Sequence, residues 1–395
     1  MNILEVHPKY KMLIIFVIAF AATWMIFWPL LKIARKAHLS DNPGERKLQT
    51  SPIPVLGGAA VFFGIMVGIS FFKTMHSFTA LFPVISTMMI MLYLGFIDDL
   101  MGIKAWKRFV LELLVAGLIV MGNRYSINNF QGLWGIDILP VFPSIIISMI
   151  TFVGIVNAIN MIDGVDGLAT GFCMLIFGCF GILFFFAEDF SFAALCAAAC
   201  GAILPFFLHN VFGYTTKMFL GDGGTMVLGT LISAMVFEIL KRSFYNYFYF
   251  ESGMDFSLIA FCLAVLSVPI FDTLRVMTER IAHHISPFSP GKNHLHHLFI
   301  DVGFSYIFTS IIELFLDILV IAIMFAVYFL GGSIDAQVYA VLVASILVNV
   351  GTAFVLRRIS ASGSAFADSV RILAYRSHIE RKGIWMKIQK VIDKE

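Results

Sequence analysis

The chain has 395 residues, of which 59% are hydrophobic and only 13% are charged. A soluble domain has about 45–50% apolar residues even when glycine is counted, and about 25% charged residues, so this composition excludes an ordinary soluble fold. A net charge of +2 gives no broad basic field of the kind that nucleic-acid-binding proteins carry, and no nucleic acid is expected as a partner. We therefore predict an all-α polytopic integral membrane protein in contact with membrane lipid.

Long uncharged segments predict about eleven transmembrane helices, because each bilayer-spanning helix needs about 20 apolar residues. The first segment is too long for the apolar part of a cleaved signal peptide, so we read it as a span. The expected spans are residues 12–31, 55–72, 78–97, 107–122, 143–160, 167–187, 191–211, 223–240, 256–273, 306–330 and 337–356. Residues 1–357 would form the transmembrane domain. Residues 358–395 would form a basic cytoplasmic tail, either on an anionic membrane surface or solvated.

The distribution of cations predicts the orientation of the chain. If the N-terminus lies outside, 21 of the 27 Lys and Arg residues fall in the inner segments. Because inner loops are enriched in Lys and Arg, this places the N-terminus outside and the C-terminus in the cytoplasm. The assignment requires an odd number of spans.

Acidic residues gather on the expected inner face. Asp98 and Asp99 end one span, Asp163 and Asp166 lie in the segment N-M-I-D-G-V-D-G, and Asp222 lies in F-L-G-D-G-G-T. Each group alone also fits an ordinary turn, since Asp-Gly is a common turn dipeptide. Carboxylates so close together need a compensating cation, and Mg²⁺ takes one or two protein carboxylates plus substrate phosphates. The groups together therefore indicate metal-assisted chemistry on a phosphate compound, carried out on cytoplasmic loops.

Glycines beside these carboxylates predict tight loops. The two Asp-Gly steps of D-G-V-D-G permit a turn that aims both carboxylates in one direction, with positive φ available at each glycine. Gly223, Gly224 and Thr225 are expected to precede a helix whose free backbone N–H groups could receive a phosphate.

A proline-punctuated loop ends in three histidines, His294, His296 and His297. They could form a metal site, an acid/base group or a phosphate clamp, and the alternative is a surface cluster without such a role. Basic residues of the inner segments are candidate phosphate ligands. They are Arg46, Lys47, Lys107, Arg108, Lys217 and Lys292.

Five motifs, in order from about residue 40 to about residue 305, resemble the polyprenyl-phosphate N-acetylhexosamine-1-phosphate transferases of glycosyltransferase family 4. They are D-N-P-G-E-R-K from Asp41, G-F-I-D-D from Gly95, N-A-I-N-M-I-D-G-V-D-G-L from Asn157, F-L-G-D from Phe219 and H-L-H-H from His294. The last motif is more similar to the undecaprenyl-phosphate GlcNAc-1-phosphate transferase branch than to the peptidoglycan branch. The stretch from Asn210 to Asp222 is a little longer than is usual in the family.

The resemblance implies transfer of a HexNAc-1-phosphate, GlcNAc-1-phosphate first among them, from a UDP-N-acetylhexosamine to undecaprenyl phosphate, with release of UMP. It implies Mg²⁺ as cofactor, with Mn²⁺ as the second candidate. The setting would be the bacterial cytoplasmic (inner) membrane, where this step initiates a cell-surface polysaccharide such as lipopolysaccharide O-antigen. A homodimer is compatible with the family.

The resemblance also implies roles for residues. The implied catalytic residues are Asp98, Asp99, His294, His296 and His297. The implied metal ligands are Asp222 and Asp98, and the implied nucleotide-binding residues are Asn160, Asp163, Asp166 and Phe219, whose ring can stack on uracil. A lipid phosphate is already nucleophilic at neutral pH, so Asp98 either orients or deprotonates it, and a two-step route through an aspartyl intermediate stays open.

Two other functions are alternatives at this point. One is the phospho-MurNAc-pentapeptide translocase of peptidoglycan synthesis. The other is a secondary transporter, since four charges, Glu112, Glu238, Glu313 and Asp317, lie within the apolar segments. These four are few, and Glu112 can pair with Arg108 at i,i+4, whereas a transporter would concentrate charge at the midplane.

Overall fold

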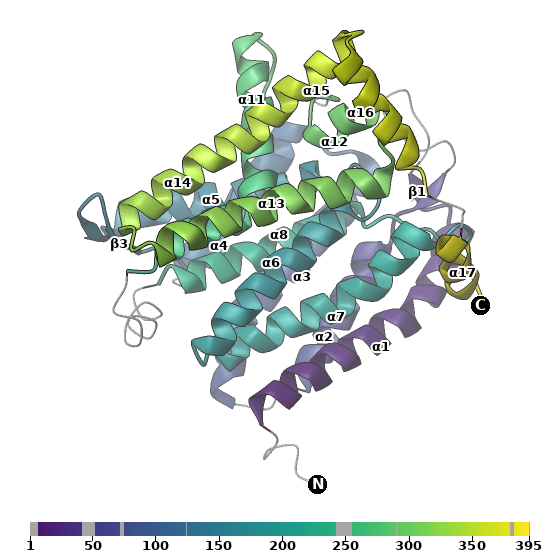
Figure 1. Cartoon of the computed structure of the whole chain (residues 1–395). Helices are drawn as coiled ribbons and strands as arrows, with labels where there is room; N and C mark the ends of the chain where they lie inside the picture. The colour runs from purple at the N-terminus through teal and green to yellow at the C-terminus, as the bar shows by residue number, and fades with distance from the viewer. Residues whose placement is uncertain are drawn as a thin grey trace.

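The computed structural model describes residues 7–41, 52–71, 75–123, 125–241, 255–289, 291–379 and 383–394. Helices make up most of this part, together with two short antiparallel strand pairs, β1–β2 and β3–β4 (Figure 1). The strands are β1 (Ser40–Asp41), β2 (Ile53–Pro54), β3 (Asn129–Leu133) and β4 (Ile136–Ile138). The first eight helices are α1 (Pro8–Lys36), α2 (Gly57–Ser70), α3 (Met75–Met101), α4 (Ala105–Asn123), α5 (Val141–Met161), α6 (Leu168–Phe186), α7 (Phe190–Phe212) and α8 (Gly221–Ile239).

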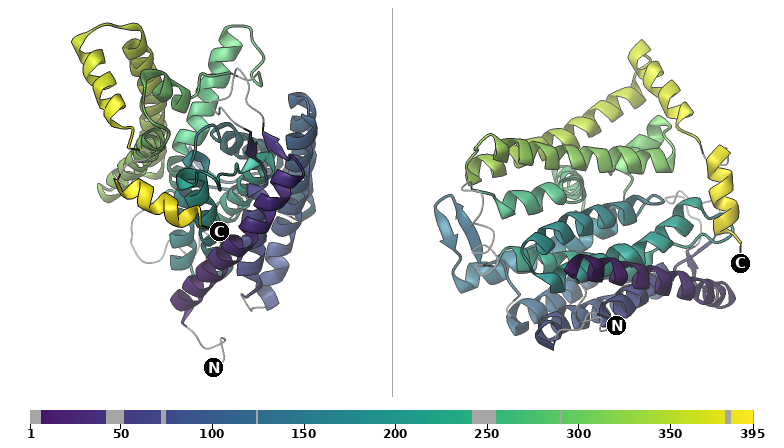
Figure 2. Two further views of the ribbon diagram at one scale, coloured as in Figure 1. Left: turned by 90° about the vertical axis from the view of Figure 1, so that its right-hand side faces the viewer. Right: turned by 60° about the horizontal axis from the view of Figure 1, so that its bottom comes forward.

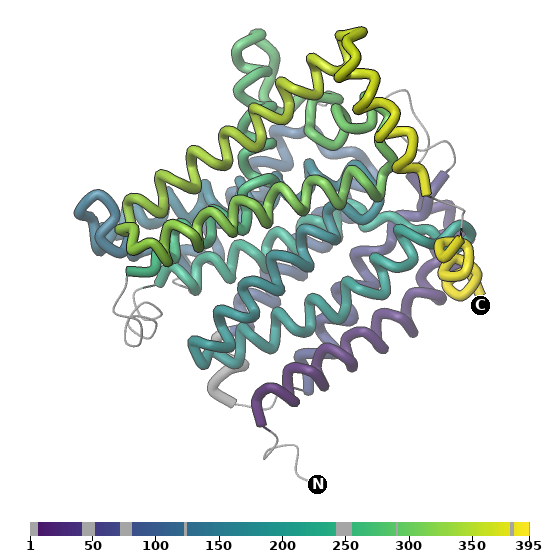
Figure 3. The backbone as a smooth tube through the Cα atoms, viewed as in Figure 1, coloured from purple at the N-terminus to yellow at the C-terminus, as the bar shows by residue number. Residues whose placement is uncertain are grey.

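The helices after α8 form an outer layer and then a return segment, α16 (Ala365–Arg376) and α17 (Gly383–Ile392), which leads back to α7. They are α10 (Leu258–Val265), α11 (Ser267–Ala282), α12 (Leu295–Val302), α13 (Tyr306–Phe329), α14 (Ile334–Ile346), the π-helical turn η2 (Leu347–Gly351) and α15 (Thr352–Ala361), followed by α16 and α17. The antiparallel pair of α13 and the α14–η2–α15 run crosses one side of the molecule (Figure 3).

The membrane-spanning character of the fold is confirmed. Within the described ranges, eight helices are long and apolar enough to cross a membrane, and α10 with α11 would make a ninth span that is bent by 71°. The two remaining expected spans also coincide with helices: the shorter apolar α2, and α4, which carries Lys107, Arg108 and Glu112. The fold is therefore an all-α polytopic one, while the count of eleven and the orientation stay predictions.

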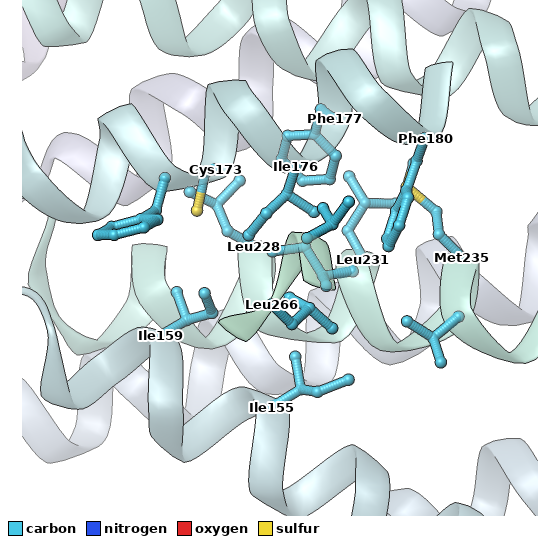
Figure 4. Packing of buried hydrophobic residues seen from close by; sticks show 14 of the residues in the cluster. Ile155, Ile159, Cys173, Ile176, Phe177, Phe180, Leu228, Leu231, Met235 and Leu266 are labelled. Atoms are coloured by element: carbon cyan, nitrogen blue, oxygen red, sulfur yellow. The ribbon is translucent and has the colours of Figure 1, made fainter. Parts of the chain in front are cut away.

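The core is built around α8, whose side chains are buried along almost its whole length. Leu228, Leu231 and Met235 of α8 pack with apolar side chains of α5 and α6, including Ile155 and Phe180 (Figure 4). A helix that is apolar on all sides is stable only when other helices surround it. The central position of α8 fixes where its N-terminus, and with it Asp222, must lie.

Glycines allow α2 and α3 to approach the first turn of α8 closely. A Cβ on Gly58 would lie 2.3 Å from the backbone nitrogen of Gly224, and one on Gly95 would lie 2.4 Å from the Cα of Gly223. Small residues at such crossings let helix backbones meet in a membrane. The expectation that Gly223, Gly224 and Thr225 precede a helix is thus wrong, because α8 begins at Gly221 and these glycines serve helix packing.

The two ends of the described chain lie at opposite ends of α1. The N-terminal residues lead into the start of α1, while α17 lies beside the far ends of α1 and α7 (Figures 1 and 2). Opposite faces for the two termini are what an odd number of spans requires. The boundary between a transmembrane domain and a tail at residue 358 stays a prediction, although α15 runs across it to Ala361.

Candidate active site

A cleft of about 570 Å³ opens at the end of the bundle where α3 and α7 end and α8 begins. The last turn of α3, the α5–α6 loop, the α7–α8 loop and α12 all contribute to its walls. Among the predicted site residues, those that line it are Asp98, Asp99, Asn160, Asp163, Asp166, Lys217, Phe219, Asp222 and His297. The sequence motifs therefore meet in one place, as the prediction of a single charged face requires.

Asp99 caps the N-terminus of α8. Its two carboxylate oxygens accept the backbone N–H groups of Asp222 at 3.0 Å and Gly223 at 3.4 Å. A carboxylate at this position satisfies N–H groups that have no partner within the helix and interacts favourably with the helix dipole. The predicted phosphate site on these N–H groups is accordingly already filled by Asp99, which ties α3 to α8.

Arg108 of α4 bridges the two sides of the carboxylate cluster. Its Nη1 lies 3.3 Å from Asp98 Oδ2 and 3.8 Å from Asp222 Oδ2, and its Nη2 donates to Asn160 Oδ1 at 3.1 Å. Its Nε lies 3.2 Å from the buried Glu112, so the predicted i,i+4 pair is confirmed. A planar guanidinium can serve several oxygens at once, and Arg108 uses this to hold Asp98 and Asp222 in register.

The side chain of Asn160 orients Asp222. Its Nδ2 donates to Asp222 Oδ1 at 2.6 Å and to Thr225 Oγ1 at 2.8 Å. About a third of the Asp222 side chain, 32%, remains exposed to the cleft. The carboxylate is thus fixed on one side and accessible on the other, which is the condition that a ligand-binding carboxylate needs.

The loop between α5 and α6 carries Asp163 and Asp166 to the cleft. Gly167 has φ +77°, and its N–H donates to Asn210 Oδ1 at 2.8 Å. Positive φ occurs at this glycine and not at Gly164, whose missing side chain instead makes room for His296. The predicted turn, with both carboxylates on one side, is therefore present.

The two carboxyl groups of this loop differ in their partners. Asp163 is exposed to the cleft, but the surrounding protein and then the charges of Asp222, Asp166 and Asp99 raise its pKa to about 7. Burial also raises the pKa of Asp166, opposed by its ion pair with Lys217. Carboxylates crowded around a cleft in this way are poised to accept a cation.

The three histidines form a row that leads away from the cleft. His297 lines it, and His296 is buried next to Gly164, where a Cβ would lie 2.5 Å from Nε2. The rings of His294 and His296 are stacked with centroids 5.7 Å apart. Burial, with the neighbouring cations, lowers the pKa of His297 to about 4. At neutral pH this imidazole is uncharged, so it can exchange hydrogen bonds with a substrate but does not act as a cationic clamp.

A buried ion pair on α11 anchors the histidine loop. Asp272 Oδ2 lies 2.7 Å from Nδ1 of His294, and Arg275 Nη2 lies 2.6 Å from both Asp272 Oδ1 and the carbonyl oxygen of Asn293. The sequence reasoning missed both residues. Their signal was an Asp and an Arg at i,i+3 in a segment that begins as an apolar span.

Comparison with known proteins agrees with this arrangement. Residues 81–240, which include most of the cleft carboxylates, match the sequence model of glycosyl transferase family 4. Over these 160 of its 395 residues, the chain is similar to that family.

Curated relatives are similar to this chain over most of its length. The undecaprenyl-phosphate alpha-N-acetylglucosaminyl 1-phosphate transferase of Salmonella typhi is 27% identical over 72% of this chain and 76% of its own length. The enzyme of the same name from Escherichia coli (strain K12) is 27% identical over 77% and 79%. The decaprenyl-phosphate N-acetylglucosaminephosphotransferase of Mycobacterium tuberculosis is 28% identical over 76% and 78%. The similarity to these relatives therefore extends over most of the chain.

Other predicted site residues lie outside the cleft. Lys107 and Lys292 are exposed side chains that do not line it, and His294 and His296 lie behind its wall. Arg46 and Lys47 fall outside the described residues. The phosphate-binding and catalytic roles of all six residues stay predictions.

Three further residues with polar side chains line the cleft without having been proposed as site residues. Asp41 ends β1, Asn210 lies near the end of α7, and Tyr306 begins α13. Asp41 opens the first motif of the resemblance, so it could have been selected from the sequence. Tyr306 could not, because an aromatic residue at the start of a span is common at membrane interfaces.

The donor set of the cleft suits a hard cation. Carboxylate oxygens of Asp98 and Asp222 line the cleft, and such oxygens are among the ligands that Mg²⁺ prefers. Within the described ranges, no three His, Cys, Asp or Glu side chains converge closely enough to hold a metal alone. That geometry fits an ion held by one or two carboxylates together with substrate phosphates.

Proposed function

We propose that this protein is a member of glycosyl transferase family 4 that transfers N-acetylglucosamine 1-phosphate from UDP-GlcNAc to undecaprenyl phosphate and releases UMP. The observation that carries the proposal is the gathering of Asp98, Asp99, Asp163 and Asp222 in one cleft at the end of a membrane bundle. The names of the relatives support a polyprenyl phosphate as acceptor and GlcNAc-1-phosphate as the transferred group.

The reaction forms one phosphorus–oxygen bond and breaks another. An oxygen of the lipid phosphate attacks the sugar-bearing phosphorus of the UDP-sugar. The bridging oxygen leaves with the uridine-bearing phosphorus as UMP. The lipid is then joined to the sugar through a diphosphate. Both phosphates of the donor and that of the acceptor carry negative charge, so the protein mainly has to position groups and compensate charge.

The cleft provides these functions from different walls. Phe219 offers a ring face for uracil, with Lys217 Nζ 5.9 Å from the ring centroid. Asp98 is held by the N–H of Ile103 at 2.7 Å and by Arg108, so we assign it to orienting the acceptor phosphate. The neutral His297 at the opposite wall can hydrogen-bond to the sugar or its phosphate.

Asp222 and Asp98 would hold the cofactor Mg²⁺, with Mn²⁺ as the second candidate. The chemistry supplied by the bound ion is charge neutralisation on the diphosphate. Arg108 complements it by keeping Asp98 and Asp222 aligned.

We place the protein in the bacterial inner membrane with the cleft toward the cytoplasm. The predicted concentration of Lys and Arg on that side supports this orientation, and UDP-sugars are cytoplasmic donors under this proposal. The product would initiate a cell-surface polysaccharide such as lipopolysaccharide O-antigen.

A donor panel tests the proposal. Purified protein is incubated with Mg²⁺, undecaprenyl phosphate and, in turn, UDP-GlcNAc, UDP-GalNAc or UDP-MurNAc-pentapeptide, and UMP and lipid-linked sugar are measured. We expect UMP with UDP-GlcNAc and none after Asp222→Asn, whereas the exposed control Asp137→Asn keeps its activity. Turnover of UDP-MurNAc-pentapeptide alone would replace the proposal by the peptidoglycan translocase function, and no turnover of any donor would overturn it.

A further inference from the structure

The α7–α8 loop, residues 213–220, brings Lys217 and Phe219 into the cleft without regular secondary structure. The second half of this loop is fixed by the body of the protein. Phe219 donates its N–H to the carbonyl oxygen of Pro54 at 2.8 Å and accepts the N–H of Gly57 at 3.0 Å. Asn210 Nδ2 donates to the carbonyl oxygen of Met218 at 3.1 Å.

The first half of the loop is held by the carboxylate of Asp393 and by Arg35, whose guanidinium donates to the carbonyl oxygen of Thr215. Oδ1 of Asp393 accepts the backbone N–H groups of Tyr214 at 3.1 Å, Thr215 at 3.2 Å and Thr216 at 3.2 Å, and the Thr216 hydroxyl at 2.9 Å. Successive N–H groups that point to one spot form a concave anion site. Hydrogen bonds to an ionised acceptor are about twice as strong as neutral ones.

This carboxylate is connected to the buried part of α7. The Thr216 hydroxyl that donates to Asp393 also lies 3.1 Å from Nδ1 of His209, which is fully buried. Eight residues before Asp393, the ring of Trp385 in α17 packs on Phe212 at the end of α7, with ring centroids 4.5 Å apart. Asp393 is therefore delivered by a docked helix.

The other end of this return segment is attached to the opposite wall of the cleft. Ser305 donates its N–H to Ser377 Oγ at 2.9 Å and its hydroxyl to the Ser377 carbonyl oxygen at 2.9 Å. Ser305 follows α12, which carries His297. Figures 1 and 2 show α16 and α17 passing along this side of the molecule. The segment thus contacts both the histidine wall and the loop that carries Lys217 and Phe219.

We propose that Asp393 is a positioning residue for binding of the nucleoside diphosphate sugar, because it orders the loop that presents Lys217 and Phe219. The inference rests on the proposed function for its substrate.

Loss of this carboxylate should weaken donor binding more than it slows chemistry. If only a fraction of molecules has the ordered loop, the apparent dissociation constant rises by the inverse of that fraction. A loop that is ordered in about one molecule in ten would raise the KM for the UDP-sugar roughly ten-fold. The carboxylates Asp98 and Asp222 are held by α3, α4 and α5, so kcat should change by less than about three-fold.

The test compares Asp393→Ala, Asp393→Asn and Asp393→Glu with the wild type and with Lys394→Ala, an exposed neighbour. Two quantities are measured in the full chain: the KM and kcat for UMP release, and amide hydrogen exchange of peptides that cover residues 213–220. We expect Asp393→Ala to raise the KM and to speed exchange in this loop, Asp393→Asn to do so less, and Asp393→Glu to restore part of both. Lys394→Ala should match the wild type.

The outcomes separate the two proposals. An active wild type with unchanged KM and unchanged exchange in Asp393→Ala overturns the role of Asp393. Equal loss of kcat and faster exchange across the whole chain also overturn it, since they indicate general destabilisation. If Asp393→Ala speeds exchange only in residues 213–220 but the wild type turns over no UDP-sugar, the ordering role of Asp393 stands and the proposed function is overturned.

Discussion

The carboxylate of Asp99 lies 3.0 Å from the backbone nitrogen of Asp222, 123 residues later in the chain. One side chain therefore has two effects: it completes the N-terminus of α8, and it sets the distance between the Asp98–Asp99 pair and Asp222. Substitutions at this position should affect both stability and turnover.

Asp99→Ala should cost about 1 kcal/mol of stability, as expected for loss of a helix cap, and lower UMP release by about 100-fold or more through displacement of Asp222. Asp99→Asn keeps an acceptor oxygen and should retain most of the stability while losing activity. The matched control is Asp189→Ala, which removes the cap of α7 at the helix end far from the cleft. A similar loss of activity in that control would contradict the assignment.

Arg108→Lys should behave like a deletion of the side chain and not like a conservative change. A lysine ammonium cannot reach Asp98, Asn160 and Glu112 together in the geometry of a guanidinium. Leaving the buried Glu112 without its partner should cost about 3–5 kcal/mol, and turnover should fall by about 100-fold. The neighbouring change Lys107→Ala removes an exposed cation outside the cleft. Turnover assays and thermal unfolding in detergent should show little effect of it, and near-normal activity of R108K would refute the bridging role.

Protonation of Asp163 should make stability depend on pH in a defined direction. Its pKa is raised from the ordinary value of 3.8 to about 7 in the folded protein, so the folded state holds a proton that the unfolded state lacks between these values. Stability contributed by this proton falls as pH rises from about 4 to about 7. Asp163→Asn stays uncharged, so its melting temperature relative to the wild type should increase across this window in metal-free buffer. Parallel curves for the two proteins would show that Asp163 ionises normally, and Asp137→Asn serves as the exposed control.

The ion pair between Asp272 and Arg275 should matter for stability because it is buried. Asp272→Ala removes the buried carboxylate that pairs with Arg275, which keeps only the partly exposed Glu279. It also releases His294, so we expect a loss of about 3–5 kcal/mol and reduced turnover. Asp368 forms the same i,i+3 pair with Arg371 on the surface. Asp368→Ala should cost at most about 1 kcal/mol. Comparable unfolding temperatures for the two variants would argue against the anchoring role of Asp272.

The spans and the motif carboxylates could be predicted from the sequence because both depend on local patterns. A membrane requires long apolar segments, and Asp98, Asp163 and Asp222 each lie in a recognisable run of residues. The cap that Asp99 provides and the anchor that Asp272 provides could not be predicted, since each joins segments far apart in the chain. The sequence predicts a loop at Gly223 because glycine disfavours helices. Gly223 is nevertheless helical, because only a glycine there lets the backbone of α8 approach Gly95 of α3.

The glycine contacts of α8 also determine which parts of the site can move. Where Gly58 and Gly95 bring α2 and α3 against the first turn of α8, no side chains lie between the backbones to repack, so these helices can shift only as one unit. That unit includes Asp98, Asp99 and Asp222. Adjustment to a bulky nucleotide sugar must then come from the opposite rim, formed by α12, so that one side of the cleft stays fixed while the other side adjusts.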